Sequence, residues 1–87
     1  MTSVYLFKSS LGYYKIGISE DVKRRLKQFS KLPFNVEYVY HKEVKYAKML
    51  ERSLHKMYNG YRIDNGGEWF SLSLEQVIEV MEILEKS

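Results

Sequence analysis

The sequence predicts an α+β domain in which a small three-stranded antiparallel central sheet is flanked by about three helices. Alternating apolar residues on both sides of a glycine-containing turn predict a β-hairpin near the N-terminus, and two later segments carry apolar residues at helical spacing. At 87 residues and 45% hydrophobic composition, the chain suits one domain over residues 1–87. We expect strands over residues 3–8, 13–18 and 34–41 and helices over residues 20–30, 44–58 and 74–86.

The first two strands are predicted to have one apolar and one polar face. The apolar face carries Val4, Leu6, Tyr14, Ile16 and Ile18. Tyr5, Tyr13 and Lys15 are expected together on the opposite face, which we interpret as polar and rich in phenol groups. Gly17 leaves open space beside them, and Gly12 can take the positive φ that a tight turn favours.

The first helix is predicted to have a basic outer surface. Ser19 is a good N-cap residue, and Glu20 and Asp21 complement the positive end of the helix. Arg25 borders the apolar stripe, and Pro33 ends the segment. The apolar stripe consists of Val22, Leu26 and Phe29, and the outward basic residues are Lys23, Arg24, Lys27 and Lys31.

The third strand and second helix follow. The strand is expected to be half buried through one face, formed by Phe34, Val36, Tyr38 and Tyr40. The helix core stripe is predicted to consist of Ala47, Leu50, Leu54, Met57 and Tyr58. Glu51 and His55 stand four residues apart, so they share one helix face beside that stripe.

The C-terminal third begins with a loop between Asn59-Gly60 and Asn65-Gly66-Gly67. Glu68-Trp69-Phe70 is expected to form a short extended piece over the domain. Ser73 with Gln76 predicts a capping box, and Leu72 with Val77 a hydrophobic staple. The inward residues of the last helix are predicted to be Leu74, Val77, Ile78, Met81 and Leu84. Val80 and Ile83 widen this apolar surface, which indicates either deeper burial, the reading we favour, or a self-association face.

Charge is distributed unevenly along the chain. Residues 1–62 contain 13 Lys and Arg against 5 Asp and Glu, whereas residues 63–87 contain one Lys against 6 acidic residues. A basic body favours a polyanionic partner, because cations that neutralise phosphates release counterions. Charge alone is equally consistent with a solvated surface and an acidic final helix. With no cysteine and no apolar run of about 20 residues, we expect a cytoplasmic protein with no membrane contact.

Several residues have the chemistry that phosphodiester cleavage requires. Such cleavage needs a group that activates water, a cation for the developing charge and usually a metal held by carboxylate. The polar candidates are Tyr5, Tyr13, Tyr14, Lys15, Arg25, His41, Glu51, His55 and Glu68. Each also has a structural interpretation: the tyrosines as packing residues, Glu51 as a surface ion-pairing residue, and His55 as a partly buried polar residue.

Four motifs together resemble the GIY-YIG nuclease superfamily, and most closely its phage and bacterial branch. They are Val4-Tyr5-Leu6 with Tyr14-Lys15-Ile16-Gly17, Arg24-Arg25-Leu26, Leu50-Glu51 through Leu54-His55, and Gly67-Glu68-Trp69-Phe70. The resemblance covers about residues 4–70. It implies a metal-dependent endonuclease, a hydrolase that cleaves DNA with Mg²⁺ or Mn²⁺ in a bacterial or phage-infected cell.

The resemblance also implies roles for individual residues. Tyr5 corresponds to the tyrosine that activates water, Arg25 to the phosphate-contacting arginine and Glu51 to the metal-binding carboxylate. Lys15 occupies the second motif's tyrosine position, and we expect it to stabilise charge at Tyr5 or contact phosphate. DNA contacts are expected from Tyr13, Tyr14, Lys23, Arg24, Lys27 and His55. Phe29 stands where many members have a histidine or tyrosine.

Two other functions remain open at this stage. One is a nucleic-acid-binding module that has lost turnover, and the other is a regulatory interaction domain that uses the apolar face of Leu74–Leu84. Because the chain has no separate DNA-reading domain, target specificity would come from a homodimer or a partner protein, or would be absent.

Overall fold

The computed structural model describes residues 1–63 and 67–87, so the Asn65-Gly66 part of the predicted loop lies outside the described residues. The α-helices are α1 (Val22–Gln28), α2 (Ala47–Met57) and α3 (Leu74–Glu85), and 3₁₀ turns cover Phe29–Lys31 and Asn59–Tyr61. The strands are β1 (Ser3–Ser9), β2 (Tyr14–Ser19), β3 (Val36–Glu43) and β4 (Trp69–Phe70). Within these residues, no helix has the length and hydropathy required to cross a bilayer.

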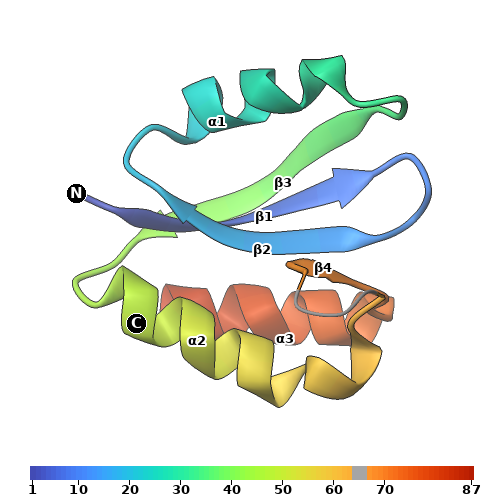
Figure 1. Ribbon diagram of the computed structural model, residues 1–87. Helices are drawn as coiled ribbons and strands as arrows, with labels where there is room; N and C mark the ends of the chain where they lie inside the picture. Colours follow the sequence, from blue (N-terminus) through green and yellow to red (C-terminus); the bar gives the residue numbers. More distant parts are fainter. Residues whose placement is uncertain (64–66) are drawn as a thin grey trace.

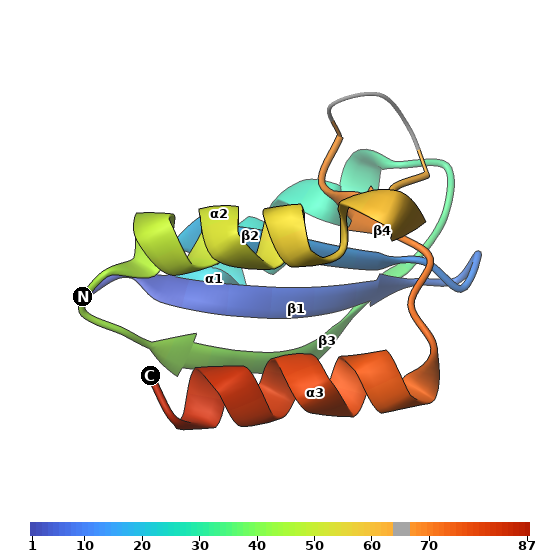
Figure 2. The same ribbon diagram turned by 90° about the horizontal axis from the view of Figure 1, so that it is seen from below.

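The strands form one antiparallel sheet in the order β3-β1-β2-β4. The predicted three strands are therefore joined by a fourth, the two-residue β4. Helix α1 covers one face of the sheet, and α2 and α3 lie together on the other (Figure 1). Seen from below, α2 lies on the β2 side of β1 and α3 on the β3 side (Figure 2). The sheet thus separates two packing layers.

The main core lies between the sheet and the α2–α3 pair. The predicted apolar face of the hairpin is confirmed, since Val4 pairs with Ile18 and Leu6 with Ile16 on this face. The fully buried members of this core include Val4, Leu6, Ile16, Leu54, Phe70, Val80 and Leu84. The capping box of Ser73 and Gln76 is also confirmed, with both of its hydrogen bonds present. This core fixes α2 against β2.

The opposite face of the hairpin is a second, aromatic core, and our prediction of a polar face was wrong. Tyr5 and Phe7 are 1% and 0% exposed, and their rings stack with centroids 4.1 Å apart. Phe7 packs edge-on against Phe29, which in turn packs edge-on against Trp69. The sequence pattern did not reveal this layer because its members come from three separate segments.

Strand β3 does not keep the simple alternation that was predicted. Leu6 pairs with Tyr40 but Phe7 pairs with Tyr38, so the register shifts and Val39 is an extra residue, as in a β-bulge. The bulge places Tyr38 and Tyr40 on opposite faces, whereas the sequence pattern put them on one. An edge strand with a bulge is also less able to pair with another chain.

Two other predictions, the N-cap of the first helix and some inward-facing residues of the last two helices, are corrected. Asp21, not Ser19, is the N-cap of α1, because its carboxylate accepts the backbone N–H of Arg24. Ser19 instead bonds to the backbone of Asp21. Three residues predicted to face the core are exposed: Met57, Leu74 and Ile78. Val80 is fully buried, as favoured.

Two leucines of α3 test this assignment of the core. Leu84 is 0% exposed and Leu74 is 71% exposed. We expect Leu84→Ala to lower the free energy of unfolding by about 2–5 kcal/mol, because it leaves a cavity in the main core. The matched change Leu74→Ala should cost less than about 0.5 kcal/mol. Urea denaturation measures both values, and equal losses would contradict the assigned orientation of α3.

Candidate functional site

The candidate site lies at the outer edge of β2, where the pairing with β4 ends. On β2, strand β4 pairs with Tyr14 and Lys15, and the backbone N–H of Ile16 donates to the carbonyl of Glu68 at 3.2 Å. The next acceptor on this edge, the carbonyl of Ile16, takes a hydrogen bond of 2.8 Å from Nε2 of His55 on α2. Helix α2 therefore runs alongside the part of β2 that β4 leaves open.

Gly17 lets the side chain of Tyr5 reach this edge. The two residues are paired across β1 and β2, and the Tyr5 ring lies over the Cα of Gly17. A Cβ atom at position 17 would overlap the hydroxyl and the ring of Tyr5. Only glycine leaves the phenol this path, so the open space predicted beside Gly17 is filled by Tyr5.

The phenol of Tyr5 is buried, and three neighbouring charged side chains affect its pKa. Its hydroxyl has no hydrogen bond of good geometry within residues 1–63 and 67–87, although the guanidinium of Arg25 lies near enough to favour its ionised form. Burial raises the pKa of Tyr5 to about 12, and the positive charge of Arg25 opposes this rise. The carboxylates of Glu68 and Glu51 raise the same pKa further. Tyr5, Arg25, Glu51 and Glu68 therefore lie close enough to influence one ionisation.

Glu51 projects from α2 into the same region and is partly buried. Its burial raises the pKa of the carboxyl group, and the nearby Glu68 adds to the effect. The charges of His55, Lys15 and Lys48 act in the opposite direction. A cation placed between two neighbouring carboxylates stabilises the ionised form of both.

Lys15 is held in an ion pair and lies among aromatic rings. Its Nζ donates to Oε1 of Glu68 at 2.8 Å, and it lies 5.7 Å and 5.6 Å from the ring centroids of Phe29 and Trp69. The side chain of Lys15 is 13% exposed and that of Glu68 is 42% exposed. From sequence, Glu68 was named as one polar candidate among nine and as part of the Gly67–Phe70 motif, but it was given no role. Its pairing with Lys15 spans 53 residues, which no local pattern reveals.

The carboxylates present suit a metal that keeps most of its waters. The described residues contain no group of three or more His, Cys, Asp or Glu side chains that would form a complete metal site. Glu51 and Glu68 offer two carboxylates, and Mg²⁺ is commonly bound through one or two. The residues therefore fit Mg²⁺ or Mn²⁺ better than a metal that needs a full set of protein ligands.

The predicted DNA-contacting residues differ in their accessibility. Lys23, Arg24 and Lys27 are exposed on α1. Tyr14 is only 8% exposed in the main core, and His55 is engaged with Ile16. Tyr13 is half-buried, and its carbonyl accepts the backbone N–H of Ser9 at 2.8 Å in the turn that contains Gly12, whose φ is 91° as expected.

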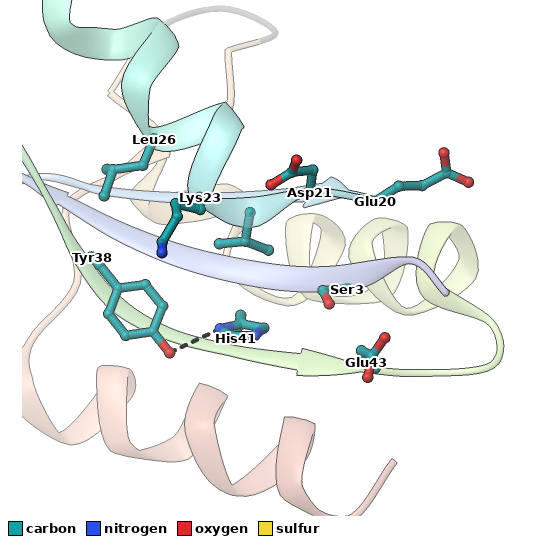
Figure 3. A pocket seen from close by; sticks show the side chains of 9 residues that line it. Ser3, Glu20, Asp21, Lys23, Leu26, Tyr38, His41 and Glu43 are labelled. Atoms are coloured by element: carbon teal, nitrogen blue, oxygen red, sulfur yellow. Dashed lines mark hydrogen bonds between the residues drawn. The ribbon is translucent and has the colours of Figure 1, made fainter.

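An open pocket of about 460 Å³ lies between α1 and β3, away from the candidate site at the edge of β2 (Figure 3). Tyr38 and His41 share a hydrogen bond of 2.9 Å there, between the phenol and Nδ1. Lys23 is the one predicted DNA-contacting residue in its lining. None of the residues predicted to be catalytic lines this pocket, and Glu43 and Asp21 give it a mixed charge.

The crossing of Tyr5 over Gly17 can be tested by adding one methyl group. Gly17→Ala should lower the free energy of unfolding by about 2 kcal/mol, because the new Cβ overlaps Tyr5. Gly60→Ala is the control, since a Cβ there meets no atom within 4 Å. We expect it to change stability by less than about 0.5 kcal/mol. Equal effects in urea denaturation would refute the close crossing.

The raised pKa of Tyr5 predicts a specific alkaline destabilisation. The native state keeps the phenolic proton up to a pKa of about 12, whereas the unfolded chain loses it near 10.0. This contribution to stability is complete below pH 10 and is lost as the pH rises through 12. Between pH 9 and 11, Tyr5→Phe should therefore lose about 1 kcal/mol less unfolding free energy than the wild type. Parallel stability curves would contradict the burial of this phenol.

Comparison with known proteins gives one family. Residues 2–85 match the T5orf172 domain, a domain related to GIY-YIG nuclease-like modules. No curated protein and no solved structure shows significant similarity to the chain. Because the match extends over nearly all of its 87 residues, the chain belongs to the T5orf172 domain family.

Proposed function

We propose that this protein is a metal-dependent endonuclease that hydrolyses phosphodiester bonds in DNA. The observation that carries the proposal is the meeting of Tyr5, Arg25 and Glu51 at the open edge of β2. These residues come from β1, α1 and α2. A phenol, a guanidinium and a carboxylate supply a proton acceptor, a phosphate ligand and a metal ligand.

Two adjoining grooves beside this edge are suited to a phosphate backbone. They measure about 520 Å³ and 490 Å³ and share Thr2 and Ile18 in their linings. The lining cations are Arg24 and Arg25 on the α1 side and Lys45 and Lys48 on the α2 side. None of these four forms an ion pair with a described residue, so their charges are available to a polyanion. Glu20 and Asp21 limit the basic surface at one end of the first groove.

Arg25 and Tyr5 would act directly on the reacting phosphate and water. The guanidinium of Arg25 can donate two parallel hydrogen bonds to phosphate oxygens and stabilise the charge that develops on them. Its charge also opposes the rise in the pKa of Tyr5. Even so, a pKa of about 12 leaves roughly one phenol in 10⁵ ionised at neutral pH. Tyr5 therefore needs further positive charge to serve as general base.

Glu51, with Glu68 nearby, would hold the divalent cation. When bound, Mg²⁺ supplies positive charge that favours ionisation of Tyr5 and stabilises the transition state. Burial and the charge of Glu68 raise the pKa of the Glu51 carboxyl group. A bound cation would stabilise the ionised carboxylate and so oppose both effects, which makes Glu51 suited to this task. His55 keeps α2 fixed to β2 through its bond to Ile16.

One observation favours a second function, a nucleic-acid-binding module without turnover. The Tyr5 hydroxyl is buried and has no hydrogen-bond partner among the described residues, which is an unfavourable environment for a base. In this alternative the basic grooves bind DNA, and Glu51 has only a structural role. DNA binding would then be sensitive to salt but independent of metal.

Nicking of supercoiled plasmid distinguishes the two functions. With Mg²⁺ or Mn²⁺ we expect the wild type to nick the plasmid, and Glu51→Ala and Arg25→Ala each to slow nicking at least about 100-fold. Glu82→Ala and Lys86→Ala make the same charge changes on or beside α3 and should cut at the wild-type rate. Each variant should retain the circular dichroism of the wild type.

The outcome decides between the proposals. An inactive wild type would refute the nuclease, and so would cleavage that survives both Glu51→Ala and Arg25→Ala. Salt-sensitive DNA binding that needs no metal and survives Glu51→Ala, from an inactive wild type, would support the binding module.

A further inference from the structure

Glu68 has a position that the proposed roles of Tyr5, Arg25 and Glu51 leave unexplained. Its backbone is anchored to β2, because its carbonyl accepts the N–H of Ile16 at 3.2 Å and the next residue, Trp69, pairs with Lys15. The side chain is thereby fixed at the point where the β2–β4 pairing ends. That point is the edge at which Tyr5 and Glu51 meet.

The Lys15 side chain is better placed to orient a carboxylate than to bind DNA. It is 13% exposed, and its Nζ lies within 6 Å of the ring centroids of both Phe29 and Trp69. Its Nζ is bonded to Oε1 of Glu68 at 2.8 Å. The pair leaves Oε2 of Glu68 without a hydrogen bond to any residue in 1–63 or 67–87, and the Glu68 side chain is 42% exposed.

Two further observations point toward a cation at this position. Ile16 connects the segments that carry the two carboxylates, because its N–H donates to the carbonyl of Glu68 and its carbonyl accepts Nε2 of His55, one helical turn from Glu51. The Tyr5 side chain is 1% exposed, and its hydroxyl lies over Gly17 of β2 without a hydrogen-bond partner of good geometry in the described chain. Two carboxylates and a buried phenol therefore share one part of β2, where Lys15 is paired with Glu68 and Arg25 lies near the phenol.

We propose that Glu68 is a second carboxylate of the cation site, opposite Glu51, and that Lys15 is the residue that positions it. The ligand class is a hard divalent cation, Mg²⁺ or Mn²⁺, bound through carboxylate oxygens and water. Lys15 fixes one oxygen of Glu68 and leaves the other for the cation. The inference rests on the proposed function, since it extends the metal-binding role of Glu51. It replaces the phosphate contact predicted for Lys15.

Trp69 provides a direct reporter of this site, because it is the only tryptophan of the chain and pairs with Lys15. Mn²⁺ is paramagnetic and quenches indole fluorescence at short range. Titration of the full chain with Mn²⁺, without DNA, should give saturable quenching of Trp69 that excess Mg²⁺ reverses. Absence of saturable quenching would overturn the proposal.

Three glutamate variants assign the ligands. Glu68→Gln keeps an oxygen that accepts from Lys15 but removes the charge, and should weaken Mn²⁺ affinity at least about tenfold. Glu51→Gln should have a similar effect. Glu82→Gln is the control on the exposed side of α3, and its affinity should equal that of the wild type. Quenching that Glu68→Gln leaves unchanged would overturn the role of Glu68.

The sign of the effect at position 15 tests the positioning role. Lys15→Met keeps an unbranched side chain beside the rings of Phe29 and Trp69. It should weaken Mn²⁺ affinity by about threefold or more, because Glu68 loses the partner that orients its carboxylate. Lys15→Arg should retain the affinity. Removing a nearby positive charge would otherwise strengthen cation binding, so tighter binding by Lys15→Met would overturn this role. A protein that binds Mn²⁺ as expected but nicks no plasmid would refute the nuclease and leave this inference standing.

Discussion

The site depends on the passage of the Tyr5 ring over Gly17. In a sheet, alternate side chains normally keep to their own face, which separates residues below α1 from residues on α2. Here a glycine on the neighbouring strand removes the obstacle, and the phenol reaches the edge where α2 lies. A side chain on the α1 face can thereby act together with a carboxylate on the opposite layer. Tyr5 can approach the layer that carries Glu51 only because position 17 has no Cβ.

The same edge shows how a short strand can have a large effect. Strand β4 has only two residues, yet it ends the pairing of β2, anchors Glu68 and places Trp69 beside Lys15. Beyond the end of β4, the carbonyl of Ile16 has no strand partner on this edge and instead accepts a hydrogen bond from Nε2 of His55. Because β4 stops there, the β2 edge is open to the two basic grooves. Charge, carboxylates and phenol therefore meet at one place.

Much of the fold could be predicted from local patterns, and much of the site could not. Short-range periodicity determines the apolar face of the hairpin and the α2 face that carries Glu51 and His55, and the residues at a helix start determine the capping box at Ser73. The structure has all three features. The aromatic core under α1 and the Lys15–Glu68 pair depend on contacts between distant segments. Neither alternation nor residue spacing encodes such contacts. The bulge at Val39 likewise depends on how β3 fits β1, so the pattern predicted one face for two tyrosines that lie on opposite faces.

We infer that Tyr5, Arg25, Glu51 and Glu68 form one cation-dependent site. An anomalous difference map from crystals of the protein that contain Mn²⁺ tests this most directly. We expect one strong peak between the carboxylates of Glu51 and Glu68, on the side that faces the Tyr5 hydroxyl. A peak at the Tyr38–His41 pocket instead, or no peak near Glu51, would contradict it.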